Sequence, residues 1–404
     1  MKSRKLIDEI RQNNFDFEAE YSLLFAMISF WEQQSYLHSD VVIVGGGILG
    51  LSTACSIKER NTRLRVTVLE RGILPAGAST KNAGFACFGS LTELIADERT
   101  LGKKKMLSLV EKRWKGLQKL RARLGDSMID YQQHGGYELL TDSELFALDH
   151  LDAMNATLFP IFNQNIFSLV NEKIKAFGFA ADTVKSLVFT SLEGQIDTGK
   201  MMLALIQKAQ SLGVIIYTGA NVTAVHPQNN SVDMEIESGK EKIKLKAHTV
   251  AVCTNAFLPD LLPQIGVTPG RGQIIATKPI DGLKFRGTFH FDHGFYYFRD
   301  FNNRVIFGGG RNQDFEAEAT IEFAPNEKIL SDLKQKLSDV ILPGTPFEID
   351  ITWQGIMGFG ETKIPFINQV SPNIFAALGC NGMGIALSSV LGDELAERML
   401  TIES

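Results

Sequence analysis

The segment from residue 40 to residue 57, DVVIVGGGILGLSTACSI, constrains the fold of this chain more than any other part of the sequence. A run of β-branched residues gives way to glycines and then to residues that suit a helix, which predicts a buried parallel strand that turns into a helix. Gly45, Gly47 and Gly50 follow the G-x-G-x-x-G spacing. In this pattern the first glycine permits a tight turn, the second lets the backbone approach a pyrophosphate, and the third lets the helix pack closely on its strand.

A second predicted strand, residues 63–69 (RLRVTVL), follows after a helix-length gap and leads into Glu70. This carboxylate stands about 20 residues beyond Gly50, where a group that binds ribose hydroxyls belongs. An acidic side chain there repels a 2′-phosphate, so an adenosine diphosphate group without that phosphate is predicted. The agreement of strand, helix and carboxylate disfavours the plainer reading of a glycine turn beside a surface glutamate. The pattern alone does not separate NAD from FAD.

The length and composition indicate an ordinary two-domain protein. A chain of 404 residues exceeds what one compact core usually holds. The net charge of -5 argues against a protein that binds nucleic acid over its whole surface. The scattered cysteines indicate neither a disulfide framework nor a zinc site: Cys55, Cys87, Cys253 and Cys380. A reducing, cytoplasmic setting fits this cysteine usage best.

Residues 1–37 are predicted to be an N-terminal extension. Its apolar stretch, residues 22–31 (SLLFAMISFW), is too short to span a bilayer, and no small-residue cleavage site follows it. We therefore expect no membrane span, and we expect this stretch to pack on the body of the protein or on a partner subunit. The oligomeric state stays open at this point.

Two further segments bear on the choice of cofactor. Residues 77–90 (GASTKNAGFACFGS) are rich in small residues yet too apolar for a surface loop, which predicts a backbone that lies against a flat ligand. Residues 373–399 contain a strand, a break at Gly379, Gly382 and Gly384, and an amphipathic helix. A glycine turn that enters a helix N-terminus stabilises an anion. Two such turns near opposite ends of one chain suggest one long ligand held at both ends.

With these segments the sequence resembles the glycine and D-amino acid oxidase-like (DAO) family of FAD-dependent flavoproteins. This family includes glycine oxidase, the sarcosine oxidases and gamma-glutamylputrescine oxidoreductase. The resemblance extends from about residue 29 to the C-terminus. Besides the fingerprint and Glu70, it rests on GASTKNAGF (77–85), GQID (194–197), VAVCTNAFLPDLLP (250–263), PGRGQ (269–273), YYFRDFNNRVIFGGG (296–310), WQGIMGFGETKIPFI (353–367) and LGCNGMGI (378–385).

The resemblance implies an α/β fold, with a Rossmann-like FAD-binding domain and a discontinuous substrate domain built on a mixed, largely antiparallel sheet. The FAD-binding pieces are expected at residues 38–98, 190–268 and 350–404, and the substrate-domain pieces at residues 99–189 and 269–349. Non-covalent FAD is also implied, because Ile356 stands where sarcosine oxidases attach their flavin.

The same resemblance assigns positions in the FAD site. The fingerprint would hold the pyrophosphate, Glu70 the adenosine ribose, and the backbone of Val222 the adenine. Residues 79–81 would contact the phosphates, residues 82–85 would lie along the flavin, and residues 382–384 would line its pyrimidine edge. The full set expected to bind FAD is Gly45, Gly47, Ile48, Leu49, Gly50, Glu70, Arg71, Ser79, Thr80, Lys81, Asn82, Ala83, Gly84, Val222, Asn255, Gly355, Gly382, Met383 and Gly384.

The chemistry implied by the resemblance is transfer of a hydride from the carbon next to an amine to flavin N5, giving an imine that water hydrolyses. The substrate would be a small amine or amino acid, and the residues expected around it are Phe85, Tyr296, Arg299 and Met357. Amino-acid oxidases of the family usually place an arginine where this chain has Met357, and a thioether cannot pair with a carboxylate. Arg299 is the alternative cation for a carboxylate, or else a structural ion pair at a strand end.

No metal site is expected in this chain. His290 and His293 are not expected to bind a metal, because residues three apart in a strand point to opposite faces. Ile306 stands where sarcosine oxidase-like members carry an oxygen-activating lysine, which favours a dehydrogenase without excluding an oxidase.

Residues 103–123 hold nine basic residues and one acidic residue, which predicts a solvated helix face. Docking of an acidic electron-carrier protein or an anionic substrate is the alternative there.

Two other classes of function stay open on the sequence. An NAD-dependent dehydrogenase would use the single fingerprint but would leave the C-terminal glycine turn unexplained. A non-catalytic FAD-binding protein is suggested by Met357.

Overall fold

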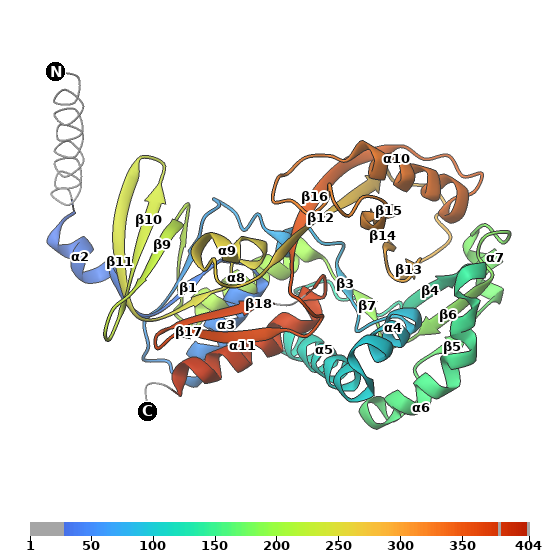
Figure 1. The fold of residues 1–404 in the computed structure, drawn as a ribbon. Coiled ribbons are helices and arrows are strands. Elements are labelled where there is room, and N and C mark those ends of the chain that lie inside the picture. The colour runs from blue at the N-terminus through green and yellow to red at the C-terminus, as the bar shows by residue number, and fades with distance from the viewer. Residues whose placement is uncertain (1–27, 379–380, 402–404) are drawn as a thin grey trace, which may run out of the picture.

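The computed structural model describes residues 28–378 and 381–401. Within them the chain forms two units, each organised around one large sheet, and Figure 1 shows the two units side by side. The chain passes from one sheet to the other more than once, so neither unit is a continuous stretch of sequence. The mixed α/β architecture agrees with the fold class predicted from the sequence.

The first sheet contains the fingerprint strand and is parallel at its centre. β1 (His38–Val44) pairs in parallel with β11 (Glu241–Val252) on one side and with β2 (Val66–Glu70) on the other. The other strands are β8 (Ile215–Thr218) beside β2, β18 (Ile374–Leu378) beside β11, β17 (Phe366–Ser371) at the edge, and β9 (Asn221–Pro227) with β10 (Val232–Ser238), which extend the sheet from β11.

The strand predicted at residues 63–69 begins later than expected, at Val66. The Arg65 amide donates to the Asp40 carboxylate, and the Arg65 carbonyl accepts from both the Asp40 and the Val41 amides. These bonds replace a regular ladder just before the strand, so the preceding residues stay outside it.

Both faces of the first sheet are buried. Along β1, Val41 and Ile43 pack on a helical layer, whereas Val42 and Val44 pack on the opposite face against residues of β9, β10 and α9 (Leu258–Leu261). Successive side chains of a strand point to opposite faces, so this continuous apolar run fits a strand covered on both sides. The helical layer consists of α3 (Ile48–Arg60), α8 (Thr198–Ser211), α11 (Gly384–Leu400) and α5 (Lys103–Leu124).

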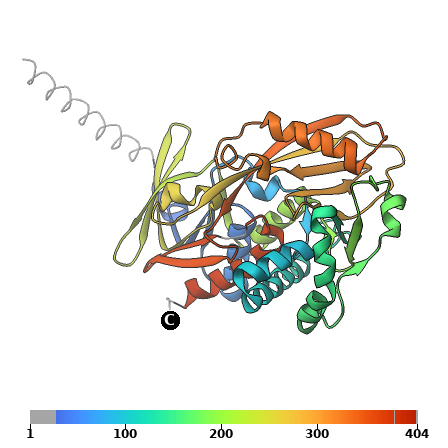
Figure 2. The same cartoon turned by 45° about the vertical axis from the view of Figure 1, so that its right-hand side comes forward.

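The basic segment at residues 103–123 forms most of α5. One side of this helix is buried, with Trp114 only partly covered, whereas residues 103–105 are exposed, so the predicted solvated helix face is confirmed. α5 lies against α11, an arrangement that can be followed in Figure 2.

The second sheet is mixed and largely antiparallel, as predicted. Only β13 and β4 pair in parallel among its described strands. In spatial order the strands are β16 (Ile349–Phe359), β12 (Thr268–Thr277), β15 (Arg304–Gly309), β14 (Tyr296–Phe301), β13 (Thr288–Phe291), β4 (Gly136–Leu140), β6 (Ser186–Thr190) and β5 (Ser168–Leu169). The surrounding helices are α4 (Leu91–Leu101), α6 (Leu151–Phe162), α7 (Glu172–Phe177) and α10 (Glu327–Lys336), and β3 (Phe85–Ala86) pairs with β7 (Gly194–Gln195) between the units.

The expected domain boundaries stay a prediction, and one of them, at residue 350, falls inside a strand of the second sheet. β16 pairs with β12 from residue 349 to residue 359, with one irregularity near its start, so the boundary expected at residue 350 falls inside this ladder. Because a backbone ladder holds its two strands together, residues 350–359 belong to the second sheet, and the chain returns to the first sheet only beyond them.

The described part of the N-terminal extension is a short helix, α2 (Phe30–Tyr36), which begins with a capping box of Ser29 and Glu32. Phe30 and Trp31 are 64% and 74% exposed. This end of the apolar stretch is exposed, and packing of the whole stretch on the body or on a partner stays a prediction. Residues 22–27 lie outside the described residues. No helix in the described part of the chain is long and apolar enough to cross a membrane.

Substitution of Gly116 by alanine tests the packing of α5 on α11. A Cβ atom at Gly116 would lie 1.9 Å from the Ala386 carbonyl oxygen, so the two helices must move apart. We expect Gly116→Ala to lower the free energy of unfolding by about 1–3 kcal/mol. Denaturant unfolding measures the loss. Gly266→Ala is the matched control, because a Cβ atom there meets nothing within 4 Å, and equal stability of the two variants would contradict the packing argument.

Candidate functional site

A cavity of about 930 Å³ lies where the carboxyl ends of the first sheet's parallel strands meet one face of the second sheet. The ends of β1, β2, β11 and β18 contribute Val44, Glu70, Cys253 and Leu378 to its wall. β12, β14 and β16 contribute Ile274, Tyr297 and Met357 from the opposite side. Segments far apart in the sequence therefore line one space.

The fingerprint forms one end of this cavity. Gly45 adopts a φ of +109°, and a Cβ atom there would lie 2.8 Å from the Cys253 carbonyl oxygen. A Cβ atom at Gly50 would lie 2.0 Å from the Gly45 carbonyl oxygen, so only glycine lets α3 begin this close to its strand. Gly47 precedes α3 and provides no side-chain cap, whereas the Ile48 amide donates to the Ser79 hydroxyl at 2.9 Å. The N-terminus of α3 thus opens on the cavity beside residue 79.

Glu70 is held firmly at the end of β2. Its Oε2 accepts from the Gly46 amide and its Oε1 from the Gly72 amide, both at 2.9 Å. These two bonds orient the carboxylate at the cavity wall, and each oxygen can still accept a further bond.

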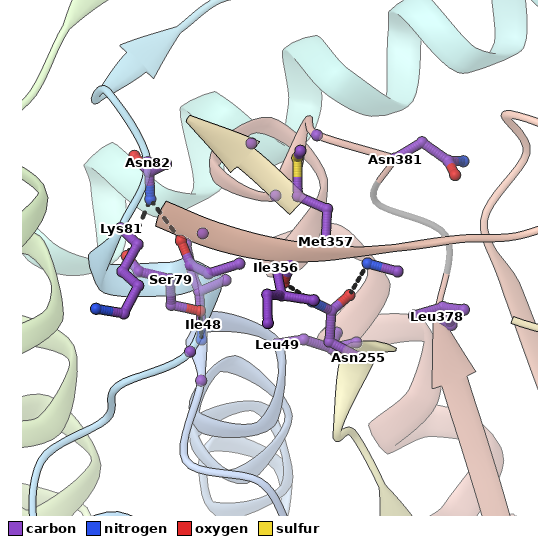
Figure 3. Close-up of a pocket in the computed structure, with 18 of the residues that line it drawn as sticks. Ile48, Leu49, Ser79, Lys81, Asn82, Asn255, Ile356, Met357, Leu378 and Asn381 are labelled. Atoms are coloured by element: carbon purple, nitrogen blue, oxygen red, sulfur yellow. Dashed lines mark hydrogen bonds between the residues drawn. The ribbon is translucent and has the colours of Figure 1, made fainter. Parts of the chain in front are cut away.

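Most of the residues expected to bind FAD line the cavity, several of them visible in Figure 3. These are Gly45, Gly47, Ile48, Leu49, Glu70, Arg71, Ser79, Lys81, Asn82, Ala83, Val222, Asn255, Gly355, Gly382, Met383 and Gly384. Phe85 and Met357 from the expected reaction centre line it as well.

Three expected cofactor residues lie behind the wall rather than in it. Gly50 serves the helix–strand contact described above. The Thr80 hydroxyl donates to the Pro75 carbonyl at 2.7 Å, which fixes the loop. A Cβ atom at Gly84 would lie 2.4 Å from the Ile196 carbonyl oxygen, so this glycine permits close packing of two segments. Each of the three shapes the backbone around the wall, and their expected contact with FAD stays a prediction.

Asn255 joins the two units at the cavity. Its amide nitrogen donates to the Ile356 carbonyl at 3.1 Å, and its amide oxygen accepts from the Gly358 backbone at 3.0 Å. Figure 3 shows these two bonds under β16, with Ile356 and Met357 projecting to opposite sides of the strand. The amide fixes β16 against the first unit and thereby holds Met357 at the cavity.

Tyr296 does not line the cavity, contrary to the sequence expectation. It is fully buried in the aromatic core on the other face of the second sheet, where its hydroxyl donates to Asp332 at 2.6 Å. The neighbouring Tyr297 lines the cavity instead, because successive strand residues point to opposite faces. Burial raises the pKa of Tyr297 to about 12, so its hydroxyl stays protonated at neutral pH.

Arg299 does not line the cavity either. Its Nη1 donates to the carbonyls of Ile196, Gly84 and Ala83, at 2.6, 3.2 and 3.3 Å. Burial lowers the pKa of Arg299 to about 10, so the guanidinium stays charged at neutral pH and holds the 83–84 segment from behind. Arg299 therefore has a structural role. A structural ion pair with a carboxylate was considered from the sequence, whereas the structure shows bonds to backbone carbonyls.

Several cavity residues were missed or read differently in the sequence. Glu93, Arg311 and Lys363 line the cavity although they were not selected from the sequence. His290 and His293 also line it, and in the sequence they were considered only as possible metal ligands. A capping-box pattern, S-x-x-E at residues 90–93, signals the start of α4 but not the direction its carboxylate faces. No group of three or more metal-binding side chains occurs in the described residues.

The assignment of Tyr297 to the cavity and of Tyr296 to the core can be tested by removing each hydroxyl. We expect Tyr296→Phe to lower the free energy of unfolding by about 1 kcal/mol or more, because a buried hydroxyl bonded to Asp332 is lost. Tyr297→Phe is the matched variant, whose hydroxyl has no protein partner among the described residues. Thermal unfolding of both proteins without added ligand decides the matter, and equal losses would contradict the assignment of faces.

The chain was also compared with known proteins. Residues 40–398 match the family model DAO, FAD dependent oxidoreductase. The chain is 25% identical over 379 residues to the probable oxidoreductase OrdL of Haemophilus influenzae, covering 90% of this chain and 83% of that protein. It is 22% identical to the gamma-glutamylputrescine oxidoreductase of Escherichia coli, covering 89% and 83%.

Solved structures agree on the fold. The L-proline dehydrogenase of P. horikoshii matches with a TM-score of 0.72 and 18% identity, over 90% of this chain and 94% of that one. The glycine oxidase of Geobacillus kaustophilus matches with a TM-score of 0.69 and 21% identity, over 89% and 95%. The chain belongs to the DAO family of FAD-dependent oxidoreductases. FAD is therefore its cofactor, and the NAD-dependent alternative is wrong.

Proposed function

We propose that this protein oxidises the carbon–nitrogen bond of a small amine, amino acid or N-substituted amino acid, acting on CH–NH or CH–NH2 donors. One observation carries the proposal. A single cavity joins the fingerprint end of the first sheet to an apolar wall of the second sheet, so a cofactor and a small substrate can share one space. The relatives named above, a gamma-glutamylputrescine oxidoreductase and a glycine oxidase, support the class of substrate.

The residues at the fingerprint end fit FAD. The open N-terminus of α3 suits a pyrophosphate, and the fixed carboxylate of Glu70 suits ribose hydroxyls. Gly382 and Met383 precede α11, whose first turn has no side-chain cap among the described residues. This second helix N-terminus faces the cavity and would stabilise negative charge at the other end of the cofactor.

FAD, when bound, supplies a hydride acceptor. The protein's own residues must then orient the amine and exclude water. Phe85 and Tyr297 meet edge to face at 5.7 Å, and Met357 stands beside them in the same wall. This part of the wall is apolar, as a site that must hold a small substrate against a flat ring requires.

Non-covalent binding of FAD is part of the proposal. Cys87 is a described cysteine in the cavity wall, and burial raises the pKa of its thiol well above its ordinary value. Attachment needs a thiolate, which this environment disfavours. Ile356 replaces the attachment residue of the sarcosine oxidases and is buried against the first unit.

A substrate carboxylate would have a different partner from the one expected. Arg311 lines the cavity, with its guanidinium 4.2 Å from the centre of the Phe359 ring, and no carboxylate lies at ion-pair distance from it in the described chain. Arg311 therefore replaces Arg299 as the candidate cation for an acidic substrate, while Met357 contributes only apolar contact.

Removal of the Glu70 carboxylate should weaken FAD binding. We expect Glu70→Ala to raise the dissociation constant of FAD about 10-fold or more, because ribose contacts and two backbone anchors are lost together. FAD content after extended dialysis, measured by absorbance, gives the result. Glu237→Ala is the control, since that glutamate of β10 forms an exposed ion pair with Lys242 of β11. Unchanged FAD retention in Glu70→Ala would count against the assignment.

Anaerobic reduction of the flavin tests the reaction itself. We expect amines, D-amino acids, N-methyl amino acids or gamma-glutamyl amines to bleach the FAD absorbance of the purified protein, and one of these classes to do so fastest. Readmission of air then separates the acceptors, because an oxidase recolours within seconds and a dehydrogenase does not. FAD that stays yellow with every class would favour the non-catalytic alternative.

A further inference from the structure

The part of the cavity wall beside Phe85 carries an acidic residue and a histidine that neither the fingerprint nor the aromatic wall explains. Glu93 comes from the first turn of α4 and His290 from β13, and both line the cavity. The His290 ring meets the Phe85 ring edge to face at 5.0 Å. The two polar groups thus stand next to the aromatic wall where the substrate is proposed to lie.

The Glu93 carboxylate is fixed in place. Its Oε2 accepts from the Ser90 amide at 3.1 Å, which closes the capping box of α4. A Cβ atom at Gly294 would lie 2.8 Å from the Glu93 carboxyl carbon, so the turn between β13 and β14 makes room for this side chain. The carboxylate therefore occupies a shaped space between α4 and the second sheet.

Glu93 has no cation at ion-pair distance among the described residues. The nearby Lys363 is paired with Asp97 at 2.7 Å, and Arg113 approaches the same aspartate at 3.7 Å. Burial opposes ionisation of Glu93, but the positive charge that His290 can carry, the Ser90 amide and these two cations hold its pKa below the ordinary value. An unpaired carboxylate beside aromatic rings attracts a cation.

His290 is 8% exposed, and its Nε2 has no hydrogen-bond partner in the described chain. A buried imidazole without a partner is costly, so its retention calls for an explanation. Burial lowers the pKa of His290 while Glu93 opposes this effect, which leaves a neutral ring at pH 7.

The other titratable groups around His290 are Tyr297, Cys87 and His293 in the cavity wall, and Glu138 and Glu193 behind α4. Tyr297 stays protonated, and the Cys87 thiol is kept protonated by burial. The backbone of His293 donates to Glu144 at 2.9 Å. Behind α4, burial raises the pKa values of Glu138 and Glu193 to about 7, and both carboxyl groups are bonded to segment 88–92.

We propose that Glu93 and His290 form an amine subsite, in which Glu93 attracts the ammonium form of the substrate and His290 accepts its proton. This inference rests on the proposed function, and it assigns roles in that reaction to two residues of the cavity wall. A carbon–hydrogen bond next to nitrogen is broken readily only when the nitrogen lone pair is free. In the step proposed, one N–H bond of the ammonium breaks and one N–H bond of the imidazolium forms, and the Glu93 carboxylate stabilises the new positive charge.

The binding role is tested with ions that cannot react. Tert-butylammonium has no hydrogen on the carbon next to nitrogen, and pivalate has nearly the same shape with the opposite charge. Titration of each into the FAD-loaded protein, followed by the visible spectrum, gives the two dissociation constants. We expect the protein to bind the ammonium and Glu93→Gln to weaken that binding about 10-fold, with no loss of pivalate binding.

The matched control is Glu32→Gln, because Glu32 also closes a capping box but lies on α2, away from the cavity. Its ammonium affinity should equal that of the unchanged protein. The proposal is overturned if Glu93→Gln leaves the affinity unchanged, or if the unchanged protein does not bind the ammonium. This readout does not depend on turnover, so it separates failure of the subsite from failure of the proposed reaction.

The proton-transfer role is tested by the pH profile of anaerobic FAD reduction in a single turnover. We expect His290→Gln to lower the rate at pH 7 about 100-fold, and the rate to recover as the pH approaches that at which the free amine predominates. His248→Gln is the control, since that exposed ring bonds only the Asn230 carbonyl. A loss that is the same at every pH would indicate a structural role and overturn the assignment.

Discussion

The site depends on a set of helix contacts that only glycine allows. Gly50 brings α3 onto β1, and Gly392 brings α11 onto α3, where a Cβ atom would lie 2.8 Å from the Thr53 amide nitrogen. Gly116 then brings α5 onto α11. Each added Cβ atom would push a helix away from its neighbour, and interiors packed at protein density do not absorb such shifts cheaply. The N-termini of α3 and α11 open on the same cavity, so contacts that hold these two helices together also hold the site together.

The second unit meets this layer through polar contacts of a different kind. Asn255 bonds two backbone groups of β16, and the Trp353 indole donates to the Lys81 carbonyl at 3.0 Å. Arg299 bonds three carbonyls at the base of the 83–84 segment. Backbone groups that would otherwise be buried without partners are thus satisfied across the boundary between the units. The cavity wall is fixed from both sides, which suits a site that must hold its geometry.

The sequence predicted the parts of the site that local patterns determine. The fingerprint turn, the position of Glu70 and the amphipathic α5 follow from spacing and periodicity, which act within a short stretch of chain. The faces of β14 did not follow, because two adjacent tyrosines satisfy the same pattern and only the pairing with β13 and β15 decides which one meets the cavity. Arg299 is on the same face of β14 as Tyr297, but there it bonds the carbonyls of the 83–84 segment and does not line the cavity, a long-range contact that the local pattern does not encode. The setting of Glu93 depends on a contact between α4 and a turn roughly 200 residues later, which no local pattern encodes.

The turn between β13 and β14 organises the charge of the substrate end. Asp292 and His293 adopt positive φ values of 52° and 54°, and Gly294 follows with 80°. This compact turn leaves space for the Glu93 carboxylate at Gly294. It also presents the Phe295 carbonyl to the Gly310 amide at 3.0 Å, and the next residue, Arg311, lines the cavity. The same turn therefore helps to position both the Glu93 carboxylate and the Arg311 guanidinium. A ligand with separated charges would be oriented by both, whereas a simple amine would be held by the carboxylate alone.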